Sequence, residues 1–325
     1  MFITKFAIPE VIFGKGAIKY LSQCAGRLGA QRVLLVSDPG LESAGWVDVI
    51  KAQLKENALH CAYFSEVNSN PRDWQVHKGA NLYKESGADV IIGLGGGSPI
   101  DTAKGIAVIA SNGGRINDFE GANKIMRPLP PMIFIPSTAG SGSDVTQFCI
   151  VTDMERQVKM TIISRSLVPN ISIIDPNLLV TKTRELIVAS AIDALAHAIE
   201  SFLSTLASPF TESQALLAIS LILENLQTAL ETRDPDALEK LSIASTAAGM
   251  SFSNAGLGIG HSLAHSLGGR YDVLHGLVHP ILLPVIMKFN AVACRRKMAV
   301  PDACTLTNPR PVDWTDLLGI CEAAW

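Results

Sequence analysis

The chain has 325 residues, of which 48% are hydrophobic and 18% charged, and its formal net charge is −3. This composition excludes a mainly disordered chain and provides enough apolar residues for two domains of roughly 100–200 residues each. With 27 basic against 30 acidic residues, there is no excess of positive charge to favour nucleic acid or an anionic membrane as a partner.

We expect neither a targeting segment nor a membrane-spanning segment. The apolar run at residues 1–6 is short, and no small-residue cleavage site follows it. Residues 281–287 form one of the longest apolar stretches, which is far below the ~20 residues that a bilayer requires. The six cysteines are scattered and include no CxxC pair, which favours reduced thiols and a cytoplasmic protein.

The first half of the sequence alternates short β-branched runs with segments of helical length. The runs at residues 32–36, 89–94 and 132–136 are apolar throughout and end in turn residues. This pattern is typical of strands that are buried on both faces of a parallel sheet. A hairpin with strands at 148–152 and 158–164 is expected next, followed by a last strand at 171–174.

After about residue 181 the pattern changes to long segments rich in Ala, Leu and Ile. Residues 184–204, 211–231 and 237–253 carry apolar side chains at the 3.6-residue spacing of a helix. The sequence therefore predicts an α/β domain with a Rossmann-like parallel sheet over residues 1–180, followed by an all-α domain over residues 181–325. Since no Gly/Ser linker separates them, we expect the domains to share a rigid cleft, a favoured place for a small-molecule site.

A run of three glycines, Gly95, Gly96 and Gly97, joins the second buried strand to a helix. Glycines let a backbone approach an anion closely, and the free N–H groups at the start of a helix attract phosphate. Ser98 and Asp101 suit the cap and the first turn of that helix. The run matches neither the GxGxxG spacing nor a P-loop, and a tight turn is the alternative, but we favour a phosphate-binding loop.

Polar residues also follow the other two buried strands. Asp38 comes after the strand at 32–36, where a carboxylate suits the ribose hydroxyls of a nucleotide, although a turn aspartate is an equal interpretation. Residues 136–144 supply hydroxyls and glycines after the strand at 132–136. Because open α/β sheets bind ligands at the carboxyl ends of their strands, the three clusters together favour a dinucleotide.

A second group of residues has the types and spacing of metal ligands. Asp193 and His197 are four residues apart, so on a helix they share a face. Four of the seven histidines lie close together further along the chain: His261, His265, His275 and His279. A single histidine is more simply an interior or surface imidazole, but these residues together favour a metal site. Their types favour Fe²⁺ or Zn²⁺ over Mg²⁺ or Ca²⁺.

These motifs, in this order, resemble the iron-containing, or group III, alcohol dehydrogenases over residues 6–290. The resemblance implies a dinucleotide-binding α/β domain and an all-helical domain, in the architecture of dehydroquinate synthase. It implies reversible hydride transfer between NAD(H) and a small alcohol, diol or aldehyde, with Fe²⁺ as the metal and Zn²⁺ as the alternative. It also implies a homodimer or a higher homo-oligomer.

The resemblance assigns roles to individual residues. It implies Asp193, His197, His261 and His275 as metal ligands and His265 as a proton relay. His279 has no ligand counterpart, so we expect it to be structural or to support the ligands. The residues implied to contact the cofactor are Asp38, Asn70, Gly96, Gly97, Ser98, Thr138, Ser141 and Lys159.

The sequence departs from the family pattern at two places. Ser190 and Ala191 stand where the family usually has Thr-Gly before the metal aspartate, and residues 291–325, Pro-rich over 301–311, read unlike the family's further helices. One alternative, from the same superfamily, is a zinc enzyme of the glycerol dehydrogenase type or an enzyme like dehydroquinate synthase. The other is a catalytically impaired NAD-binding remnant whose truncated helical domain does not complete the site.

Overall fold

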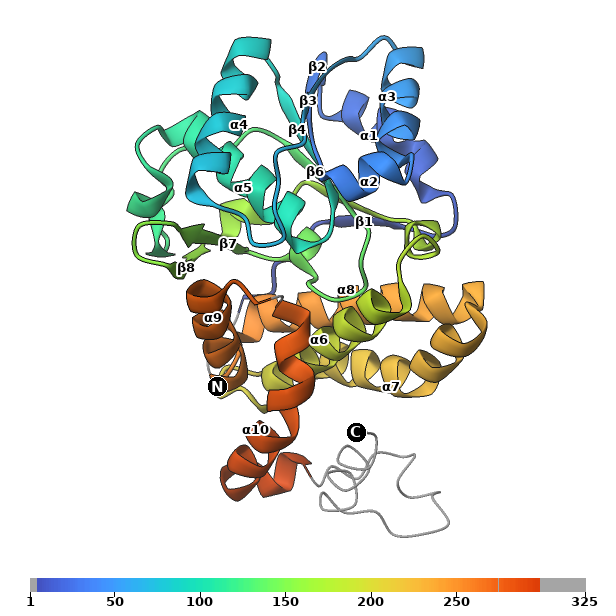
Figure 1. Ribbon diagram of the computed structural model, residues 1–325, viewed down its shortest axis with the longest axis vertical. Coiled ribbons are helices and arrows are strands. Elements are labelled where there is room, and N and C mark those ends of the chain that lie inside the picture. Colours follow the sequence, from blue (N-terminus) through green and yellow to red (C-terminus); the bar gives the residue numbers. More distant parts are fainter. Residues whose placement is uncertain (1–4, 274, 299–325) are drawn as a thin grey trace.

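The chain has a sheet-containing part followed by a bundle of helices, as Figure 1 shows for the computed structural model, which describes residues 5–273 and 275–298. Within these ranges, all strands precede Asp175, and the regular structure from Arg184 onward is helical. The predicted fold class, a parallel sheet with helices followed by an all-helical part, is confirmed. Residues 299–325, which include the atypical tail, lie outside the described residues.

The strands are β1 (Glu10–Phe13), β2 (Arg32–Val36), β3 (His60–Phe64), β4 (Val90–Gly95), β5 (Gly121–Ala122), β6 (Met132–Pro136), β7 (Phe148–Asp153), β8 (Val158–Ile163) and β9 (Ile171–Ile174). The helices are α1 (Leu21–Arg27), α2 (Pro39–Ser43), α3 (Trp46–Glu56), α4 (Asp73–Ser86), α5 (Gly97–Asn112), α6 (Arg184–Leu203), α7 (Pro209–Thr232), α8 (Pro235–Ala255), α9 (Ile259–Tyr271) and α10 (His275–Met298). Short 3₁₀ turns are η1 (Ala17–Tyr20), η2 (Ile116–Phe119), η3 (Ser143–Val145), η4 (Arg165–Leu167) and η5 (Pro176–Leu179).

The larger sheet is parallel and has the strand order β1-β9-β6-β4-β2-β3. Its central strands β2, β4 and β6 are the three continuous apolar runs of the sequence, and each is almost completely buried. Because β4 lies between β2 and β6, the carboxyl ends of these three strands are neighbours. The three polar clusters predicted from the sequence therefore meet at one edge of the sheet.

Helices cover both faces of this sheet because alternate side chains of each strand point to opposite sides. Leu34 and Val36 of β2 belong to the core that also contains residues of α4 and α5. Val33 and Leu35 belong to the core on the other face, with residues of α1 and α3. Figure 1 shows α4 and α5 on the left of the sheet and α1 and α3 on its right.

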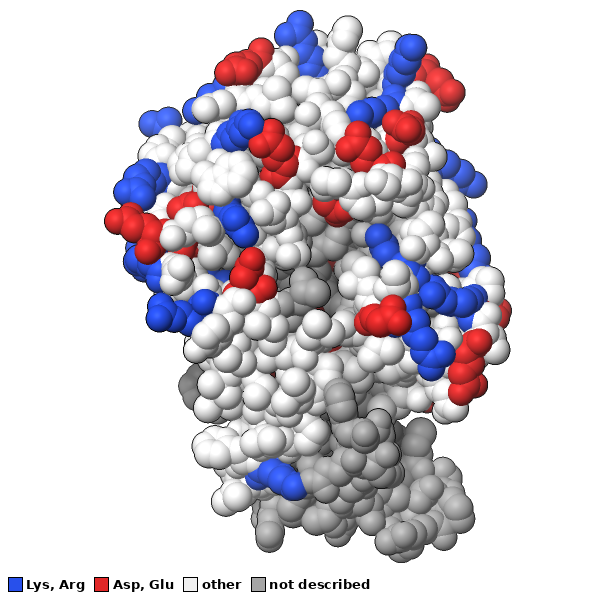
Figure 2. All heavy atoms as spheres, in the orientation of Figure 1, with Lys and Arg blue, Asp and Glu red and all other residues white. Residues whose placement is uncertain are grey.

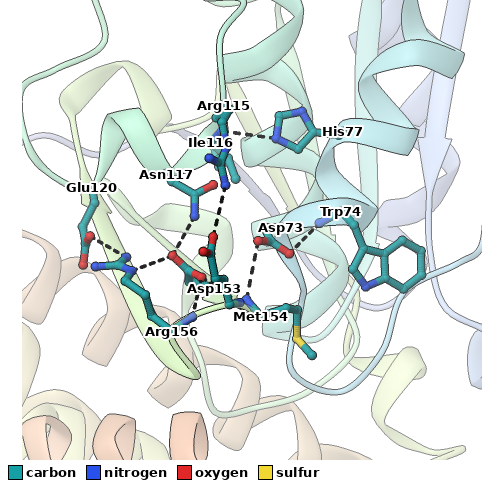
Figure 3. Close-up of polar contacts among 11 residues, drawn as sticks. Asp73, Trp74, His77, Arg115, Ile116, Asn117, Glu120, Asp153, Met154 and Arg156 are labelled. Carbon is teal, nitrogen blue, oxygen red and sulfur yellow. Dashed lines mark hydrogen bonds and ion pairs between the residues drawn. The ribbon is translucent and has the colours of Figure 1, made fainter.

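A second, small sheet contains β5, β8 and β7, and the predicted hairpin is confirmed as the antiparallel pair β7–β8. The buried carboxylate of Asp153 organises its turn, since it accepts hydrogen bonds from Nε of Arg156 (2.6 Å) and Nδ2 of Asn117 (2.7 Å), as Figure 3 shows. Burial alone would raise the pKa of Asp153, but these bonds and the backbone N–H of Arg156 lower it to about 2. The turn holds β8, which carries Lys159, in place.

The predicted helices at 184–204, 211–231 and 237–253 are confirmed as α6, α7 and α8. Each begins at a side-chain cap, provided by Thr183, Ser208 and Asp234 respectively. Buried alanines of α6, α7 and α8 form much of the hydrophobic core of the helical part, and small side chains let the helices approach closely. The last two helices, α9 and α10, contain the four clustered histidines.

Two helices of the described chain are long and apolar enough, by length and composition, to cross a bilayer: α6 and residues 275–294 of α10. In α6, 72% of the apolar window is buried inside the protein, as is usual for a core helix, whereas in α10 the buried share is 39%. The expectation that no segment spans a membrane was based on uninterrupted apolar runs and stays a prediction.

The sheet part and the helices touch through backbone where the loop after β6 meets α8. Gly142 has a left-handed φ of 57°, and a Cβ built there would lie 2.7 Å from Cα of Gly249 in α8. A Cβ on Gly140 of the same loop would lie 2.7 Å from Cβ of Ser190 in α6. These glycines are required because no side chain fits at either contact.

Candidate metal and dinucleotide site

A cleft of about 940 Å³ lies between the carboxyl edge of the sheet and the helices α6, α9 and α10. Its volume is in the range of about 300–1,000 Å³ that small-molecule sites occupy. Every site residue assigned from the sequence lines it, with the exception of Gly95. On the face drawn in Figure 2, positive and negative side chains are mixed over the sheet part, in line with the near-neutral composition.

The glycine run forms the start of α5, with Gly96 as the N-cap residue and Gly97 as the first helical residue. Gly95 has a positive φ of 152°, and a Cβ on it would lie 2.5 Å from Pro99, so it shapes the turn behind the cleft. A Cβ on Gly96 would lie 3.2 Å from Oγ1 of Thr138. No side chain caps α5, and its first N–H groups have no partner within the helix, so they are available to an anion in the cleft.

Ser98 and Asp101 of α5 both make contacts within the protein. Oγ of Ser98 donates a hydrogen bond to the carbonyl oxygen of Ser69. Oδ2 of Asp101 accepts one from the backbone N–H of Ile150 in β7 at 3.1 Å, and burial raises the pKa of Asp101 to about 6. Asp101 therefore ties α5 to the hairpin, in addition to lining the cleft.

Asp38 and Ser141 lie on the cleft wall on either side of the glycine run. Oδ1 of Asp38 caps α2 by accepting a hydrogen bond from the N–H of Leu41 at 3.0 Å. Oγ of Ser141 accepts a bond from the N–H of Ser143 at 3.3 Å, and a Cβ on Gly97 would lie 3.1 Å from Cβ of Ser141. Both polar groups therefore have fixed positions beside the start of α5.

Lys159 and Asn70 connect the sheet part to α9. The side chain of Lys159 passes over Gly268, where a Cβ would lie 2.8 Å from Cε of the lysine, and burial lowers the pKa of Lys159. Nδ2 of Asn70 donates to Oδ1 of Asp272, at the end of α9, at 2.6 Å, and Nη2 of Arg72 lies 3.3 Å from Oδ2 of the same carboxylate. Asn70 thus holds the C-terminal end of α9, besides lining the cleft.

The metal-ligand types converge from three helices. Asp193 is on α6, His261 on α9, and His275 and His279 are one turn apart at the start of α10. One donor atom of each of these four residues lies within 4.8 Å of the other three. The distances from Oδ1 of Asp193 to the Nε2 atoms are 3.8 Å for His261, 3.5 Å for His275 and 3.3 Å for His279.

These separations have the scale expected of atoms that share one ion. Ligands about 2.1 Å from a tetrahedral metal lie about 3.4 Å from one another. Charge-assisted N–H···O hydrogen bonds are shorter, at about 2.7–2.9 Å. The distances around Oδ1 of Asp193 therefore match a set of ligands better than a set of hydrogen bonds.

His197 borders this group and is placed differently from the other three predicted ligands. Its ring stacks between those of Phe252 and His261, with centroids 4.3 Å from each. Its Nδ1 is buried and has no hydrogen-bond partner. His279, which the sequence analysis expected to be structural or supporting, lies inside the converging group.

Buried polar atoms without partners indicate that the group fits a cation. They are Oδ1 of Asp193, Nδ1 of His197, Nε2 of His261 and Nδ1 of His275. Leaving such atoms unpaired in the interior costs free energy, which a divalent ion bound at the donor atoms that face the group would offset.

The protonation states also suit a metal. Burial alone would raise the pKa of Asp193, but the imidazoles of His197 and His275 hold it well below its usual range. Burial lowers the pKa of His197 to about 3 and that of His279 to about 4, so both rings are neutral at pH 7 and have a lone pair to donate.

His265 lies on the cleft wall beside the ligands. Its ring centroid is 6.4 Å from that of His261 and 5.3 Å from that of His275. Burial lowers the pKa of His265 to about 3. The ordinary pKa of an imidazole lies near neutral pH, whereas the half-buried ring of His265 is neutral at rest and can accept a proton only transiently.

The sequence analysis did not assign Glu200 to the site, although the structure places this residue against a predicted ligand. Oε2 of Glu200 lies 2.6 Å from Nδ1 of His261, and the carboxylate accepts hydrogen bonds from the backbone N–H groups of Gly258 (3.1 Å), Gly260 (2.6 Å) and His261 (3.3 Å). Since a carboxylate accepts, Nδ1 of His261 donates to Glu200, and Nε2 is the ring atom that faces Asp193 and is left for a metal. The i, i+7 spacing from Asp193, which places both carboxylates on one face of α6, was the available signal.

Comparison with known proteins covers nearly all of the described chain. The family model described as "Iron-containing alcohol dehydrogenase" matches residues 9–176, and the model for the C-terminal part of that family matches residues 187–300. An NAD-dependent methanol dehydrogenase of Bacillus methanolicus is 38% identical over 299 residues, which are 91% of this chain and 78% of that protein. A 1,3-propanediol dehydrogenase of Klebsiella pneumoniae is 38% identical over 298 residues, covering 90% of this chain and 77% of that protein.

Solved structures show the same fold. A crystal structure of a 1,3-propanediol oxidoreductase superposes with a TM-score of 0.93 at 36% identity, covering 99% of this chain and 85% of that one. An alcohol dehydrogenase from Oenococcus oeni gives a TM-score of 0.93 at 33% identity, with the same coverage.

Proposed function

The chain belongs to the iron-containing alcohol dehydrogenase family, and from that premise we propose which of its residues hold the metal, the cofactor and the substrate. The protein is a metal-dependent, NAD-linked alcohol dehydrogenase and aldehyde reductase. The proposed metal ligands are Asp193, His197, His261 and His275. The proposed cofactor contacts are Asp38, Asn70, Gly95, Gly96, Gly97, Ser98, Asp101, Thr138, Ser141 and Lys159.

One observation supports this assignment more than any other. Asp193, His261 and His275 line the same cleft as Gly96 and Gly97 at the uncapped start of α5. A site for a cation and a site for a phosphate therefore share one cavity, as hydride transfer to a metal-held substrate requires.

When bound, the metal supplies Lewis acidity to the substrate oxygen, and the nicotinamide accepts or donates the hydride. The protein groups bind, orient and move the proton. The N–H groups at the start of α5 receive the pyrophosphate, and Asp38 is placed to accept hydrogen bonds from ribose hydroxyls. Glu200 holds the ring of His261, and the neutral ring of His265 is positioned to take the hydroxyl proton of the alcohol and pass it toward solvent.

We infer that the substrate is a short alcohol, diol or aldehyde. The similar proteins include enzymes named for methanol, for 1,3-propanediol and, in Escherichia coli, for lactaldehyde. Phe252, which stacks on His197, lines the cleft together with further apolar side chains, and these suit a short carbon chain: Phe148, Ile150, Leu257 and Leu277.

We further propose that residues 1–180 and 181–325 form two domains, that the enzyme is a homodimer or a higher homo-oligomer, and that it is cytoplasmic. The change from strands to helices between β9 and α6 supports the domain division. The cysteines of the described residues, Cys24, Cys61, Cys149 and Cys294, are all free, which agrees with a reducing compartment.

The test is NADH formation by purified, metal-depleted protein reloaded with Fe²⁺ or Zn²⁺, measured at 340 nm over a series of short alcohols and diols. We expect reduction of NAD⁺ that requires the metal. Activity on glycerol with zinc alone would favour the zinc enzyme of the glycerol dehydrogenase type. Tight NADH binding without turnover of any alcohol or aldehyde, with either metal, would favour a catalytically impaired NAD-binding protein.

A further inference from the structure

His279 has the surroundings of a metal ligand, although the family resemblance gave it no such role. Its side chain is 1% exposed, and its Nε2 lies 3.3 Å from Oδ1 of Asp193 and 3.4 Å from Nε2 of His275. His275 and His279 are one turn apart on α10, so their rings lie on the same helix face. Of the three Nε2 atoms around this carboxylate oxygen, that of His279 is the nearest.

A purely hydrogen-bonded role for His279 does not account for this arrangement. A neutral imidazole carries one N–H, and three Nε2 atoms lie 3.3 to 3.8 Å from a single oxygen that has no hydrogen-bond partner. The two facing Nε2 atoms of His275 and His279 could share one proton, but that contact would leave the oxygen of Asp193 unsatisfied. One cation at the centre of these atoms satisfies all of them together.

We propose that His279 coordinates the catalytic metal, so that this chain offers the ion one carboxylate and four imidazoles. The proposal rests on the proposed function, because it takes the ion at Asp193 to be the metal of the dehydrogenase. It differs from the ligand set that the resemblance implies by one donor. The feature of the sequence that encodes the difference is the histidine one turn after His275.

The test compares the wild type with His279→Ala and, as a control, His265→Ala, which removes another imidazole beside the site that lies outside the converging group. Metal affinity is measured by chelator competition, and the number of imidazoles around bound Zn²⁺ by X-ray absorption spectroscopy. We expect His279→Ala to bind metal more weakly by more than the roughly 10–100-fold that loss of a supporting group costs, and to lose one imidazole from the count. His265→Ala should leave the metal affinity and the imidazole count unchanged.

A second variant covers the case in which His279→Ala does not fold, as judged by circular dichroism and NADH binding. His279→Gln keeps a polar side chain of similar length, and loading with Co²⁺ reports on the ligand set through the visible absorption bands. A shifted Co²⁺ spectrum in His279→Gln supports coordination. An unchanged spectrum, or an unchanged affinity and imidazole count in His279→Ala, overturns it.

The proposed function and the role of His279 would be contradicted by different results. Wild-type protein that takes up no metal and reduces no NAD⁺ would remove the proposed function itself. Wild-type protein that is loaded and active, with a His279→Ala variant that binds metal equally well, would remove only the role of His279.

Discussion

Nδ1 of His261 lies 2.6 Å from Oε2 of Glu200, and both side chains are almost completely buried. Burial alone would lower the pKa of His261, but the carboxylates of Asp193 and Glu200 raise it. The pair couples α6 to α9 and sets the direction in which the ring of His261 faces the metal position.

Replacement of Glu200 should therefore weaken metal binding without removing a ligand. In Glu200→Gln, the amide NH₂ would face N–H donors that now meet a carboxylate oxygen, and metal affinity should fall roughly 10–100-fold. Chelator competition measures the change, and Glu224→Gln, which alters an exposed glutamate on α7, is the matched control. Equal affinity in the two variants would contradict the positioning role.

Asp38 should determine the preference for NAD⁺ over NADP⁺. Asp38→Asn keeps a side-chain cap for the N–H of Leu41 but removes the charge that repels a 2′-phosphate. We expect the ratio of kcat/KM for NADP⁺ to that for NAD⁺ to rise by roughly tenfold, equivalent to about 1.4 kcal/mol, with an unchanged melting temperature. A ratio that stays the same while both kcat/KM values fall would mean that Asp38 contributes only by capping α2 and does not select the cofactor.

His265→Ala should lower turnover and leave metal content unchanged. If the ring relays the proton, kcat should fall by about 10²-fold, the lower end of typical acid–base contributions, and added imidazole should restore part of it. Steady-state rates with and without imidazole, together with metal analysis, check this. Loss of bound metal in proportion to loss of activity would show that the assignment is wrong.

The carboxylate of Asp153 should stabilise the fold in a pH-dependent way. Its pKa is about 2 in the folded chain and about 3.9 when unfolded, so its contribution is present above pH ~4 and is lost as the pH falls toward 2. Asp153→Asn should therefore lower the free energy of unfolding by on the order of 2 kcal/mol at pH 7, and by clearly less at pH 3. Urea unfolding of both proteins at the two pH values measures this, and a difference that is the same at both would exclude the mechanism.

The central strands could be predicted because β2, β4 and β6 are buried on both faces and read as continuous apolar runs. The edge strands β1 and β3 were not predicted. Each has one neighbour, and their side chains are mostly half-buried or exposed, so polar residues such as Glu10 and His60 interrupt the pattern. Pairing partners that lie far apart in sequence, such as β1 with β9, leave no local signal.

The site could be predicted where its residues lie one helical turn apart in the sequence. The turn-separated pairs Asp193/His197, His261/His265 and His275/His279 could be recognised within single helices. Which member of each pair faces the common centre depends on how α6, α9 and α10 pack against one another. The positions of His197 and His279 in the structure illustrate this, and Glu200 became visible only through its contact with α9.

The contact between Gly142 and Gly249 has a further consequence for catalysis. Main-chain atoms of the loop after β6 lie directly against main-chain atoms of α8 there, and main-chain atoms cannot move aside as the end of a flexible side chain can. Any larger residue at either position would push the loop after β6 away from α8. The distance from the nicotinamide to the substrate carbon would then increase although no active-site residue had changed.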